Sequence, residues 1–375
     1  MMMKKKVCHI TSAHNRYDQR ILHKECISLY EAGYNVTLLV NDEKMDERYK
    51  GVEIRSTGKN YKNKRVKRMV LGVHALYKMA KAEKADIYHF HDPELLCLAK
   101  KLKRKGCYVI FDSHENYYEQ ILQKNYIPVF FRKMVAKGYR KYESSVLNII
   151  DGVIFPVCME GIDIEKRAKR VAYVNNVPKL DELPSVKTEP KGRKICYAGG
   201  LTYNRGVKHL AEAAKRADVQ LYLAGTFESD ELKKCVTDDE RHVHYEGFLS
   251  RTELYELYQK CAIGMSTLLN VGQYSKMQNL PTKVYEYMAM GMPVILSDIP
   301  YNRSVIEEYQ FGVVVDPQNV TEIANSITCL MDNPSAMKTM GEKGRELIYG
   351  KWNWSIEEKN LLCLYKELGD EYKKM

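Results

Sequence analysis

The sequence lacks the features that mark several large classes of protein. No apolar stretch approaches the roughly 20 residues that a membrane-spanning helix needs, since even the stretch 146–157 is broken by Asp151. After the basic residues at the start, the apolar stretch 7–10 is too short for the core of a signal peptide. None of the ten cysteines belongs to a Cys-x-x-Cys pair, and several lie in apolar runs, as buried reduced thiols do. We therefore expect a cytoplasmic protein.

Two motifs of nucleotide and metal chemistry are missing as well. The chain holds neither the Gly-x-Gly-x-x-Gly fingerprint of dinucleotide-binding folds nor an Asp-x-Asp pair. Hydrophobic residues make up 45% and charged residues 29%, which excludes disordered, collagen-like and disulfide-scaffold classes. Lys and Arg number 59 against 48 Asp and Glu. The formal net charge of +11 favours an anionic partner, such as nucleic acid, a phosphorylated substrate or a membrane surface.

Short β-branched runs alternate with segments of helical length along the whole chain. The first series of runs covers 7–11, 35–40, 52–55, 86–90, 108–112 and 153–157, and the second covers 194–198, 219–224, 243–245, 263–267, 293–297 and 312–316. Most runs of the second series are continuously apolar, which is typical of parallel strands buried under helices on both faces. A length of 375 residues leaves room for two domains. We therefore predict two doubly wound α/β domains in tandem.

The domain boundary is predicted from a stretch rich in proline and charge. Prolines, glycine and charged residues accumulate between 175 and 193, and we place the break near residue 188. The prediction is an N-terminal domain 1–188 and a C-terminal domain 189–354. The final segment, 355–375, carries apolar residues at helical spacing after Ser355 and Glu358, and we expect this helix to pack back on the N-terminal domain. Ligands of such sheets bind beyond the carboxyl ends of the strands, which predicts a site in the cleft between the domains.

A glycine-bearing loop follows the first strand of the second series. Gly199, Gly200, Arg205 and Gly206 lie between the strand 194–198 and a helix expected from Val207. Backbone N–H groups and the positive end of the helix dipole suit a diphosphate at such a place, and Arg205 adds a charge. A plain tight turn is the alternative interpretation.

The stretch from Gln278 to Ile295 is more informative. A helix is expected to start near Pro281 and to stop at Gly291, before an apolar strand. Lys283 falls in the first turn, where a cation opposes the helix dipole unless an anion is bound there. Glu286, one turn later, is a candidate for accepting two hydrogen bonds from ribose hydroxyls. The alternative is that Glu286 is a solvated carboxylate on the helix surface.

A polar cluster in the first half admits two interpretations. The sequence brings His89, His91, Asp92 and Glu94 close together after the strand 86–90, and all four are possible metal ligands. The interpretation that we favour is structural, with Asp92 and Pro93 as the N-cap and first turn of a helix ending near 105. We predict no metal site.

Two basic stretches carry much of the positive charge. The stretch from Lys59 to Arg68 contains six cations and no acid, and an apolar helix face over 66–80 adjoins it. The stretch from Lys124 to Lys141 contains six more, again without an acid, with aromatic and aliphatic residues between them. Such stretches suit anionic lipid headgroups. The alternative is a solvated face above a stripe that faces the core.

These motifs together carry a resemblance. The stretch Pro281-Thr-Lys-Val-Tyr-Glu-Tyr-Met-Ala-Met-Gly-Met-Pro-Val-Ile, preceded by Gly199-Gly-Leu-x-x-x-Arg-Gly, resembles the donor-binding half of family 4 retaining glycosyltransferases. In the first half, His91-Asp-Pro-Glu-Leu-Leu, Phe111-Asp-Ser-His-Glu and Asp18-x-Arg-Ile-x-x-Lys-Glu resemble a bacterial branch that acts in surface-polysaccharide assembly. The resemblance implies the GT-B fold, with two Rossmann-like domains around a cleft. The N-terminal domain would bind the acceptor and the C-terminal domain the nucleotide sugar.

The resemblance implies roles for residues of the donor side. Glu286 matches the second Glu of the family's Glu-x7-Glu motif and would hold the donor ribose. Arg205 stands in place of a diphosphate-binding Lys, and Gly200 replaces an Arg often found in the same loop. Gln278 replaces the first Glu, which usually contacts the donor sugar. Lys283 would make up for the lost cation, an inference from its charge and placement. Gly199 and Gly206 complete the expected donor site.

On the acceptor side, the resemblance implies that His114 lies near the transferred sugar. Glu115 would orient an acceptor hydroxyl, and we place His91 on this side as well. His114, Arg205 and Lys283 are the expected catalytic residues. With no Asp-x-Asp motif, charge on the leaving diphosphate would be stabilised by cations and helix N-termini rather than by a metal.

The sequence therefore predicts a retaining, metal-independent glycosyltransferase. A hexose-type sugar would move from a nucleotide sugar, expected to be a UDP-sugar, to a glycan or lipid-linked oligosaccharide in capsule, exopolysaccharide or O-antigen synthesis. We expect no cofactor, no nucleic-acid partner, and a cytoplasmic protein peripheral to the inner face of the plasma membrane. The alternatives are a GT-B-fold sugar-nucleotide epimerase, or a non-enzymatic basic protein that binds RNA or membrane.

Overall fold

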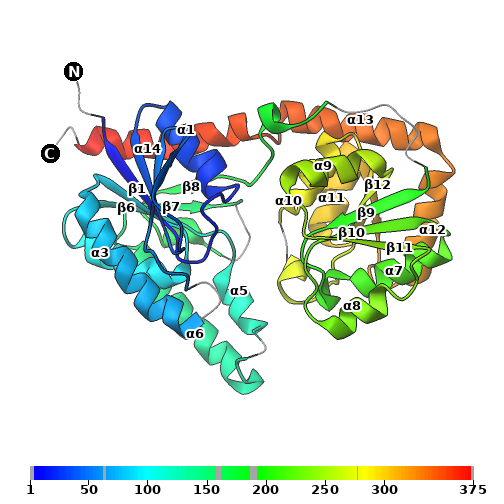
Figure 1. Cartoon of the computed structure of the whole chain (residues 1–375), viewed down its shortest axis with the longest axis horizontal. Coiled ribbons are helices and arrows are strands. Elements are labelled where there is room, and N and C mark those ends of the chain that lie inside the picture. Colours follow the sequence, from blue (N-terminus) through cyan, green and yellow to red (C-terminus); the bar gives the residue numbers. More distant parts are fainter. Residues whose placement is uncertain are drawn as a thin grey trace. The chain divides into compact units, whose positions relative to one another are not determined.

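The computed structural model describes residues 4–61, 65–124, 126–157, 162–185, 192–276 and 278–372. They form two compact units, which Figure 1 colours by sequence. The N-terminal unit comprises Met1–Asn176 together with Ser355–Met375, and the C-terminal unit comprises Val177–Trp354. Each unit is a doubly wound α/β domain, which confirms the predicted fold class. The expected cleft between the domains stays a prediction.

The N-terminal unit is built on an eight-stranded sheet in the order β3-β4-β2-β1-β5-β6-β7-β8. Its strands are β1 (Lys6–Ile10), β2 (Asn35–Val40), β3 (Glu47–Tyr49), β4 (Val52–Ser56), β5 (Ile87–Phe90), β6 (Tyr108–Asp112), β7 (Gly152–Phe155) and β8 (Val171–Tyr173). The strands pair in parallel except for β3, which runs antiparallel to β4. The chain enters at β1, winds outward to β3 and β4, and returns beside β1 as β5. The order of the strands therefore reverses between β1 and β5.

Helices cover both faces of this sheet. They are η1 (Ile21–Cys26), α1 (Ile27–Glu31), α2 (Arg65–Lys67), η2 (Arg68–Gly72), α3 (Val73–Glu83), η3 (Pro93–Leu95), α4 (Leu96–Lys103), α5 (Tyr117–Leu122), α6 (Val129–Leu147), η4 (Ile164–Lys166) and α14 (Trp354–Tyr372). Cys8 and Ile10 share a core with α3, α4 and α6. Because successive residues of a strand point to opposite faces, His9 points to the other side, where the hydroxyl of Tyr365 in α14 lies 3.4 Å from its Nε2.

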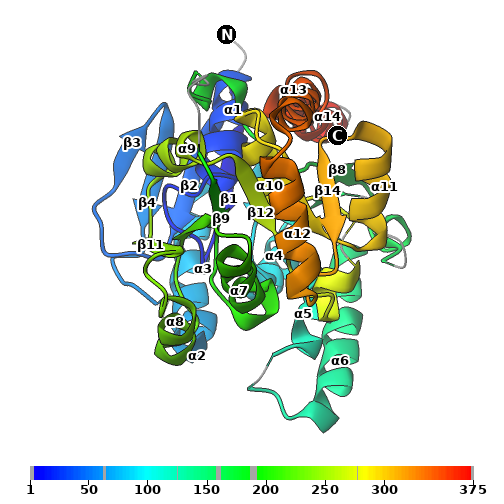
Figure 2. The ribbon, with the colours of Figure 1, turned by 90° about the vertical axis from the view of Figure 1, so that its right-hand side faces the viewer.

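The C-terminal unit has a six-stranded parallel sheet in the order β11-β10-β9-β12-β13-β14. The strands are β9 (Lys194–Ala198), β10 (Gln220–Ala224), β11 (Val243–Gly247), β12 (Ile263–Ser266), β13 (Val294–Ser297) and β14 (Gly312–Val315). The helices are η5 (Leu180–Glu182), η6 (Tyr203–Arg205), α7 (Val207–Arg216), α8 (Asp230–Val236), α9 (Arg251–Lys260), η7 (Gly272–Lys276), α10 (Thr282–Ala289), α11 (Pro300–Tyr309), α12 (Val320–Met331) and α13 (Pro334–Gly350). Figure 2 shows α7 and α12 side by side on one face of the sheet. In this sheet the strand order reverses between β9 and β12.

The boundary between the units differs from the prediction. It lies between Asn176 and Val177, not near residue 188, and the segment 186–191 lies outside the described residues. Val177 is fully buried in a core that it shares with Ala198 and Leu280 of the C-terminal unit. The proline-rich composition marked the connecting segment, but the burial of Val177 decides where the domain begins.

Two local predictions hold only in part. Asp92 is the N-cap residue of η3 and Pro93 follows it, as predicted, but the Asp92 carboxylate makes no capping hydrogen bond. It binds the loop after β1 instead, where Ser12 N and Thr11 Oγ1 donate to Oδ2 at 2.6 and 2.8 Å. The apolar face expected over 66–80 is divided, because Val73 and Ala80 are buried while Val66 is exposed.

Among the described residues, no helix is both long and apolar enough to cross a bilayer.

Candidate active site

The donor-side residues gather around a cavity in the C-terminal unit. The cavity has a volume of about 360 Å³ and lies beside the ends of β9 and β12, where the strand order reverses. Open α/β sheets bind their ligands at such a reversal. The lining comprises Ala198, Gly199, Arg205, Leu254, Tyr258, Leu268, Tyr274, Pro281, Thr282, Lys283 and Glu286. Four predicted donor residues are thus brought together, whereas Gly200, Gly206 and Gln278 lie outside that lining in the described structure.

Glycine is required at the turn from β9 into α7. Gly206 has a φ of 72°, in the left-handed region, and a Cβ there would overlap the carbonyl oxygen of Thr267. This close approach brings the loop of β9 against the end of β12 and starts α7 at Val207, as the sequence predicted. The backbone thereby directs the N-terminus of α7 toward the end of the sheet.

Two cations reach the same glycine of this loop. A Cβ built at Gly199 would lie 3.2 Å from Arg205 Nη1 and 3.7 Å from Lys283 Nζ. The Lys283 ammonium also sits 3.4 Å from the centre of the Tyr197 ring. Burial and the charge of Arg205 lower the pKa of Lys283 well below its usual value. An anion between the two cations would remove that repulsion, which is what a diphosphate would do.

Glu286 lies one turn after Lys283 on α10 and faces the same cavity. The Tyr258 hydroxyl donates a hydrogen bond to Glu286 Oε2 at 3.1 Å, which fixes the carboxylate. On the other side, Arg205 Nε donates to the hydroxyl of Tyr274 at 3.3 Å. Sequence reasoning missed both tyrosines, because a tyrosine in an amphipathic segment gives no sign of the pocket that it lines.

In the N-terminal unit, the candidate residues lie at the carboxyl ends of β1, β5 and β6. His114 Nε2 lies 3.0 Å from Asp112 Oδ2. Arg20 holds the same carboxylate from the other side, donating from Nε and Nη2 at 2.8 and 2.9 Å. Burial would raise the pKa of Asp112, but the charges of Arg20 and His114 outweigh it, and the pKa is well below its usual value. Asp112 is therefore a carboxylate that orients the His114 ring.

A row of imidazoles continues inward from His114. The Nδ1 of His91 lies 3.3 Å from His114 Nε2, and His91 Nε2 lies 2.9 Å from His9 Nδ1. His89 Nδ1 lies 2.9 Å from the Tyr365 hydroxyl. Burial lowers the pKa of His91 to about 4 and the pKa values of His9 and His89 well below the usual value. These three rings are therefore neutral at neutral pH, and His91 is a buried support of His114.

The possible metal ligands are grouped differently from the cluster His89, His91, Asp92 and Glu94. Ligand atoms of two groups lie within 4.8 Å of one another, namely His9, Glu25, His89 and His91, and His91, Asp112 and His114. The rings of His89 and His91 stack with centroids 4.5 Å apart and an angle of 25° between their planes. Glu94 turns away and accepts hydrogen bonds from Arg68 Nε at 2.7 Å and Ser12 Oγ at 2.8 Å. In the first group, His9 Nδ1 and His91 Nε2 lie 2.9 Å apart, so one nitrogen of each ring already takes part in a hydrogen bond between the rings. That no metal is needed stays a prediction.

A second histidine–carboxylate pair stands beside the first. His14 Nδ1 lies 3.2 Å from Asp92 Oδ1, and the His14 and His114 rings are 4.9 Å apart. Burial would lower the pKa of His14, but the hydrogen bond and charge of Asp92 outweigh it and raise the pKa. Sequence reasoning missed His14, although it follows the end of a strand as His114 does.

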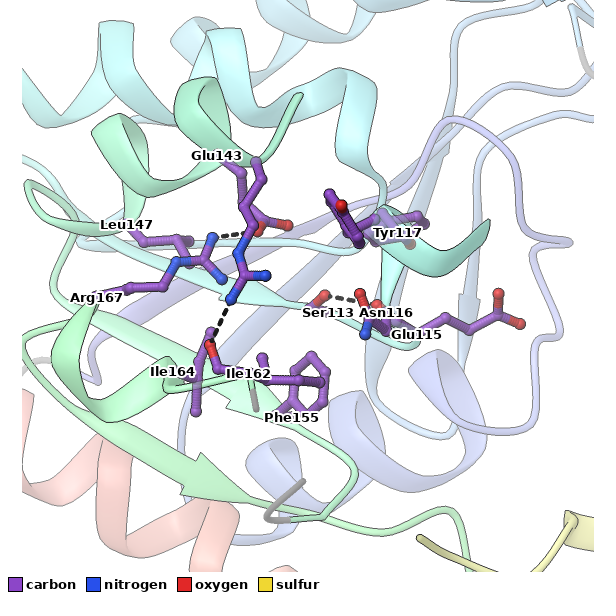
Figure 3. Close-up of a pocket in the computed structure, with 12 residues that line it drawn as sticks. Ser113, Glu115, Asn116, Tyr117, Glu143, Leu147, Phe155, Ile162, Ile164 and Arg167 are labelled. Carbon is purple, nitrogen blue, oxygen red and sulfur yellow. Dashed lines mark hydrogen bonds and ion pairs between the residues drawn. The ribbon is translucent and has the colours of Figure 1, made fainter. Parts of the chain in front are cut away.

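Glu115 faces solvent, next to a small cavity of about 20 Å³ that Figure 3 shows with its lining side chains. Its carboxylate accepts a hydrogen bond from Gln120 Nε2. Ser113 Oγ donates to the carbonyl of Glu115 at 3.1 Å, and Glu143 pairs with Arg167 on the other side of this cavity. The cavity has room for little more than water. Its ion pair and hydrogen bonds therefore hold the segment after His114 in place.

Two doubly wound domains, each with polar side chains where the strand order reverses, are the architecture of the GT-B class. Residues 4–166 match the family model described as Glycosyltransferase Family 4, and residues 180–347 match the model described as Glycosyl transferases group 1. The chain belongs to the family 4 glycosyltransferases with the GT-B fold.

Characterised proteins agree with this membership. The chain is 25% identical over 183 residues to alpha-D-kanosaminyltransferase of Streptomyces kanamyceticus, covering 47% of this chain and 46% of that protein. It is 25% identical over 236 residues to poly(ribitol-phosphate) alpha-N-acetylglucosaminyltransferase of Staphylococcus aureus, covering 60% of this chain and 45% of that protein. The chain thus spans about half the length of these curated relatives.

The fold is shared over nearly the whole chain with solved structures. Sucrose-phosphate synthase from Thermosynechococcus elongatus superposes with a TM-score of 0.78 at 17% identity, covering 98% of this chain and 100% of that one. Anabaena HepE in complex with UDP-glucose superposes with a TM-score of 0.67 at 14% identity, covering 99% and 100%.

Proposed function

We propose that the protein is a retaining, metal-independent glycosyltransferase that uses a UDP-sugar. The observation that carries the proposal is the convergence of Arg205, Lys283 and Glu286 on one cavity of about 360 Å³. Two cations suit a diphosphate, and a fixed carboxylate suits the hydroxyls of a ribose. HepE, with the same fold, was solved with UDP-glucose, which supports the choice of nucleotide.

In the proposed reaction, the diphosphate is the leaving group and carries the negative charge that develops. The bond between the anomeric carbon and the diphosphate oxygen breaks, and the acceptor hydroxyl oxygen bonds to that carbon on the same face. The acceptor proton passes to the leaving phosphate oxygen. Arg205 and Lys283 stabilise the charge on the diphosphate as it develops, because they are held in place before the reaction begins. His114, oriented by Asp112, contacts the transferred sugar.

The proposed acceptor is a glycan or lipid-linked oligosaccharide in the synthesis of a cell-surface polysaccharide. The poly(ribitol-phosphate) transferase of Staphylococcus aureus among the relatives supports this role. We place the protein in the cytoplasm, on an anionic membrane surface. Support comes from exposed apolar side chains beside the two basic stretches, including Val70, Val129 and Phe130. Lys62 and Lys64 of the first stretch lie outside the described residues.

The first test is thermal-shift binding of UDP, GDP and ADP in the presence of EDTA. We expect UDP to raise the melting temperature, and Glu286→Ala to abolish the rise. Glu256→Ala, which removes an exposed carboxylate of α9 outside the cavity lining, should respond like the parent protein. No stabilisation by any nucleotide would overturn the donor site. Conversion of the donor to its epimer without transfer would favour the epimerase.

The membrane proposal has its own test, which is co-sedimentation with vesicles of anionic lipid at low salt. Phe130 is 94% exposed and Phe248, in the C-terminal unit, is 84% exposed. Phe130→Asp should therefore reduce the bound fraction, and the matched variant Phe248→Asp should leave it unchanged. Equal binding to neutral and anionic vesicles would contradict the proposal.

A further inference from the structure

A large cavity of the N-terminal unit begins beside the histidine–carboxylate pairs. Its volume is about 660 Å³, within the range of roughly 300–1,000 Å³ that holds small-molecule ligands. Ala13 and Asp92, next to His14, line its inner end, and it runs outward between η2 and the α5–α6 pair. We call it the α6 groove. Its inner end therefore adjoins the pair of His14 and Asp92.

The polar lining of the α6 groove favours an anion. Arg65, Arg68 and Lys124 line it, with the Arg65 guanidinium 4.0 Å from the centre of the Tyr126 ring. The two carboxylates of the lining are already bound, Glu94 by Arg68 and Asp92 by His14. The groove thus presents a net positive charge, and Arg residues suit a phosphate because of their forked donors.

The rest of the wall is apolar. Met69, Ile121, Ile127 and Val135 line it, together with aromatic rings. Met69 is 47% exposed and Val135 is 40% exposed, so the wall continues onto the open surface of η2 and α6. There it meets the exposed apolar residues that we propose to lie against the membrane. A free phosphate or an uncharged sugar would contact only one of the two parts of the groove, the basic lining or the apolar wall.

We propose that the α6 groove binds a phosphate ester of a long apolar chain, with the phosphate at Arg65 and Arg68 and the chain along Met69 and Val135. The inference rests on the proposed function and narrows the acceptor to a lipid-linked phosphate. The chain leaves the groove over η2 and α6, while the sugar carried on the phosphate lies toward His14 and His114. The partner is a lipid anion by charge complementarity.

The test uses the full chain and soluble probes without nucleotide sugar. Octyl phosphate, octyl glucoside and inorganic phosphate are titrated by calorimetry below the micellar concentration. We expect octyl phosphate to bind at least ten times more tightly than either of the others. Arg68→Gln removes a cation and releases Glu94, and it should weaken octyl phosphate at least tenfold, as should Val135→Asp. Lys78→Gln, at an exposed lysine of α3 outside the lining, should bind like the parent protein.

Three results would overturn the proposal. If octyl glucoside bound as tightly as octyl phosphate, the groove would not recognise the phosphate group. If inorganic phosphate bound as tightly, the groove would not recognise the apolar chain. Equal weakening by Arg68→Gln and Lys78→Gln would mean that the net charge of the protein, rather than the groove, attracts the probe. UDP binds at the proposed cavity of the C-terminal unit, and its binding is measured in a separate experiment. An α6 groove that does not bind octyl phosphate can therefore be told apart from a donor site that does not bind UDP.

Discussion

His91 lies between the protein interior and the candidate site, with its Nε2 2.9 Å from Nδ1 of His9. Its Nδ1 faces Asp112 Oδ2 at 3.5 Å, and His114 Nε2 faces the same oxygen at 3.0 Å. A carboxylate only accepts hydrogen bonds, so His114, the nearer of the two rings, presents an Nε2–H group to it. A neutral His114 with its proton on Nε2 has an unprotonated Nδ1. Asp112 thus fixes which nitrogen of His114 can accept a proton.

We therefore predict that neutral His114 is the Nε2–H tautomer. Nitrogen chemical shifts of the ring report the tautomer directly. Asp112→Asn should disturb it, because an amide presents a donor where the carboxylate only accepts, whereas Tyr365→Phe, at the far end of the row, should leave it unchanged. An Nδ1–H tautomer in the parent protein would refute the arrangement.

Kinetic constants should separate the donor residues. Glu286→Ala should raise the donor KM by about 10-fold to 100-fold, since hydrogen bonds to a charged group contribute about 1.5–3 kcal/mol. Arg205→Ala should instead lower kcat by about 100-fold, the scale seen when one preorganised donor to a developing anion is removed. Steady-state kinetics with Glu256→Ala as the control checks both. Unchanged constants in the two variants would contradict the assignment.

UDP binding should be coupled to a proton through Lys283. Because burial and Arg205 lower the pKa of Lys283 in the free protein, part of the population is neutral once the pH exceeds that lowered value. A bound diphosphate raises the pKa again, so binding takes up a proton and weakens as the pH rises. Calorimetry in buffers of different ionisation enthalpy measures the uptake. Lys283→Met should abolish it, and uptake that persists in this variant would point to another group.

The N-terminal unit should lose stability in mild acid. The folded pKa of His91 is about 4, below the value of roughly 6.5 in an unfolded chain, so the unfolded state binds protons first as the pH falls. This contribution is present above pH about 6.5 and is lost progressively down to pH about 4, amounting to about 3 kcal/mol. Amide hydrogen exchange of β1 and β5 between pH 7.5 and 5 measures it. His91→Phe should reduce the dependence of stability on pH. If the slope of stability against pH were unchanged in this variant, the dependence would have to come from His9 and His89.

The sequence by itself determined the two sheets. Each of the twelve runs predicted as strands is a strand, because apolar β-branched runs between helical segments have few other places in an α/β fold. It also singled out Arg205, Lys283 and Glu286 as candidate site residues. Their places in a glycine-bearing turn and at the start of a helix can be recognised from the local sequence. The short edge strands β3 and β8 were missed, because β3 carries the charged residues Glu47 and Arg48 and each strand is only three residues long.

Tertiary structure decided which distant residues meet. His9, His91, His114 and Tyr365 come from β1, from the segments after β5 and β6, and from α14, and no spacing along the chain relates them. Asp92 is held by the loop after β1 rather than by its own helix, because parallel strands bring their carboxyl ends to one edge. The domain boundary follows the burial of Val177, not the prolines after it. Local composition determines which segments form helices and strands, whereas burial and strand order determine which distant side chains come into contact.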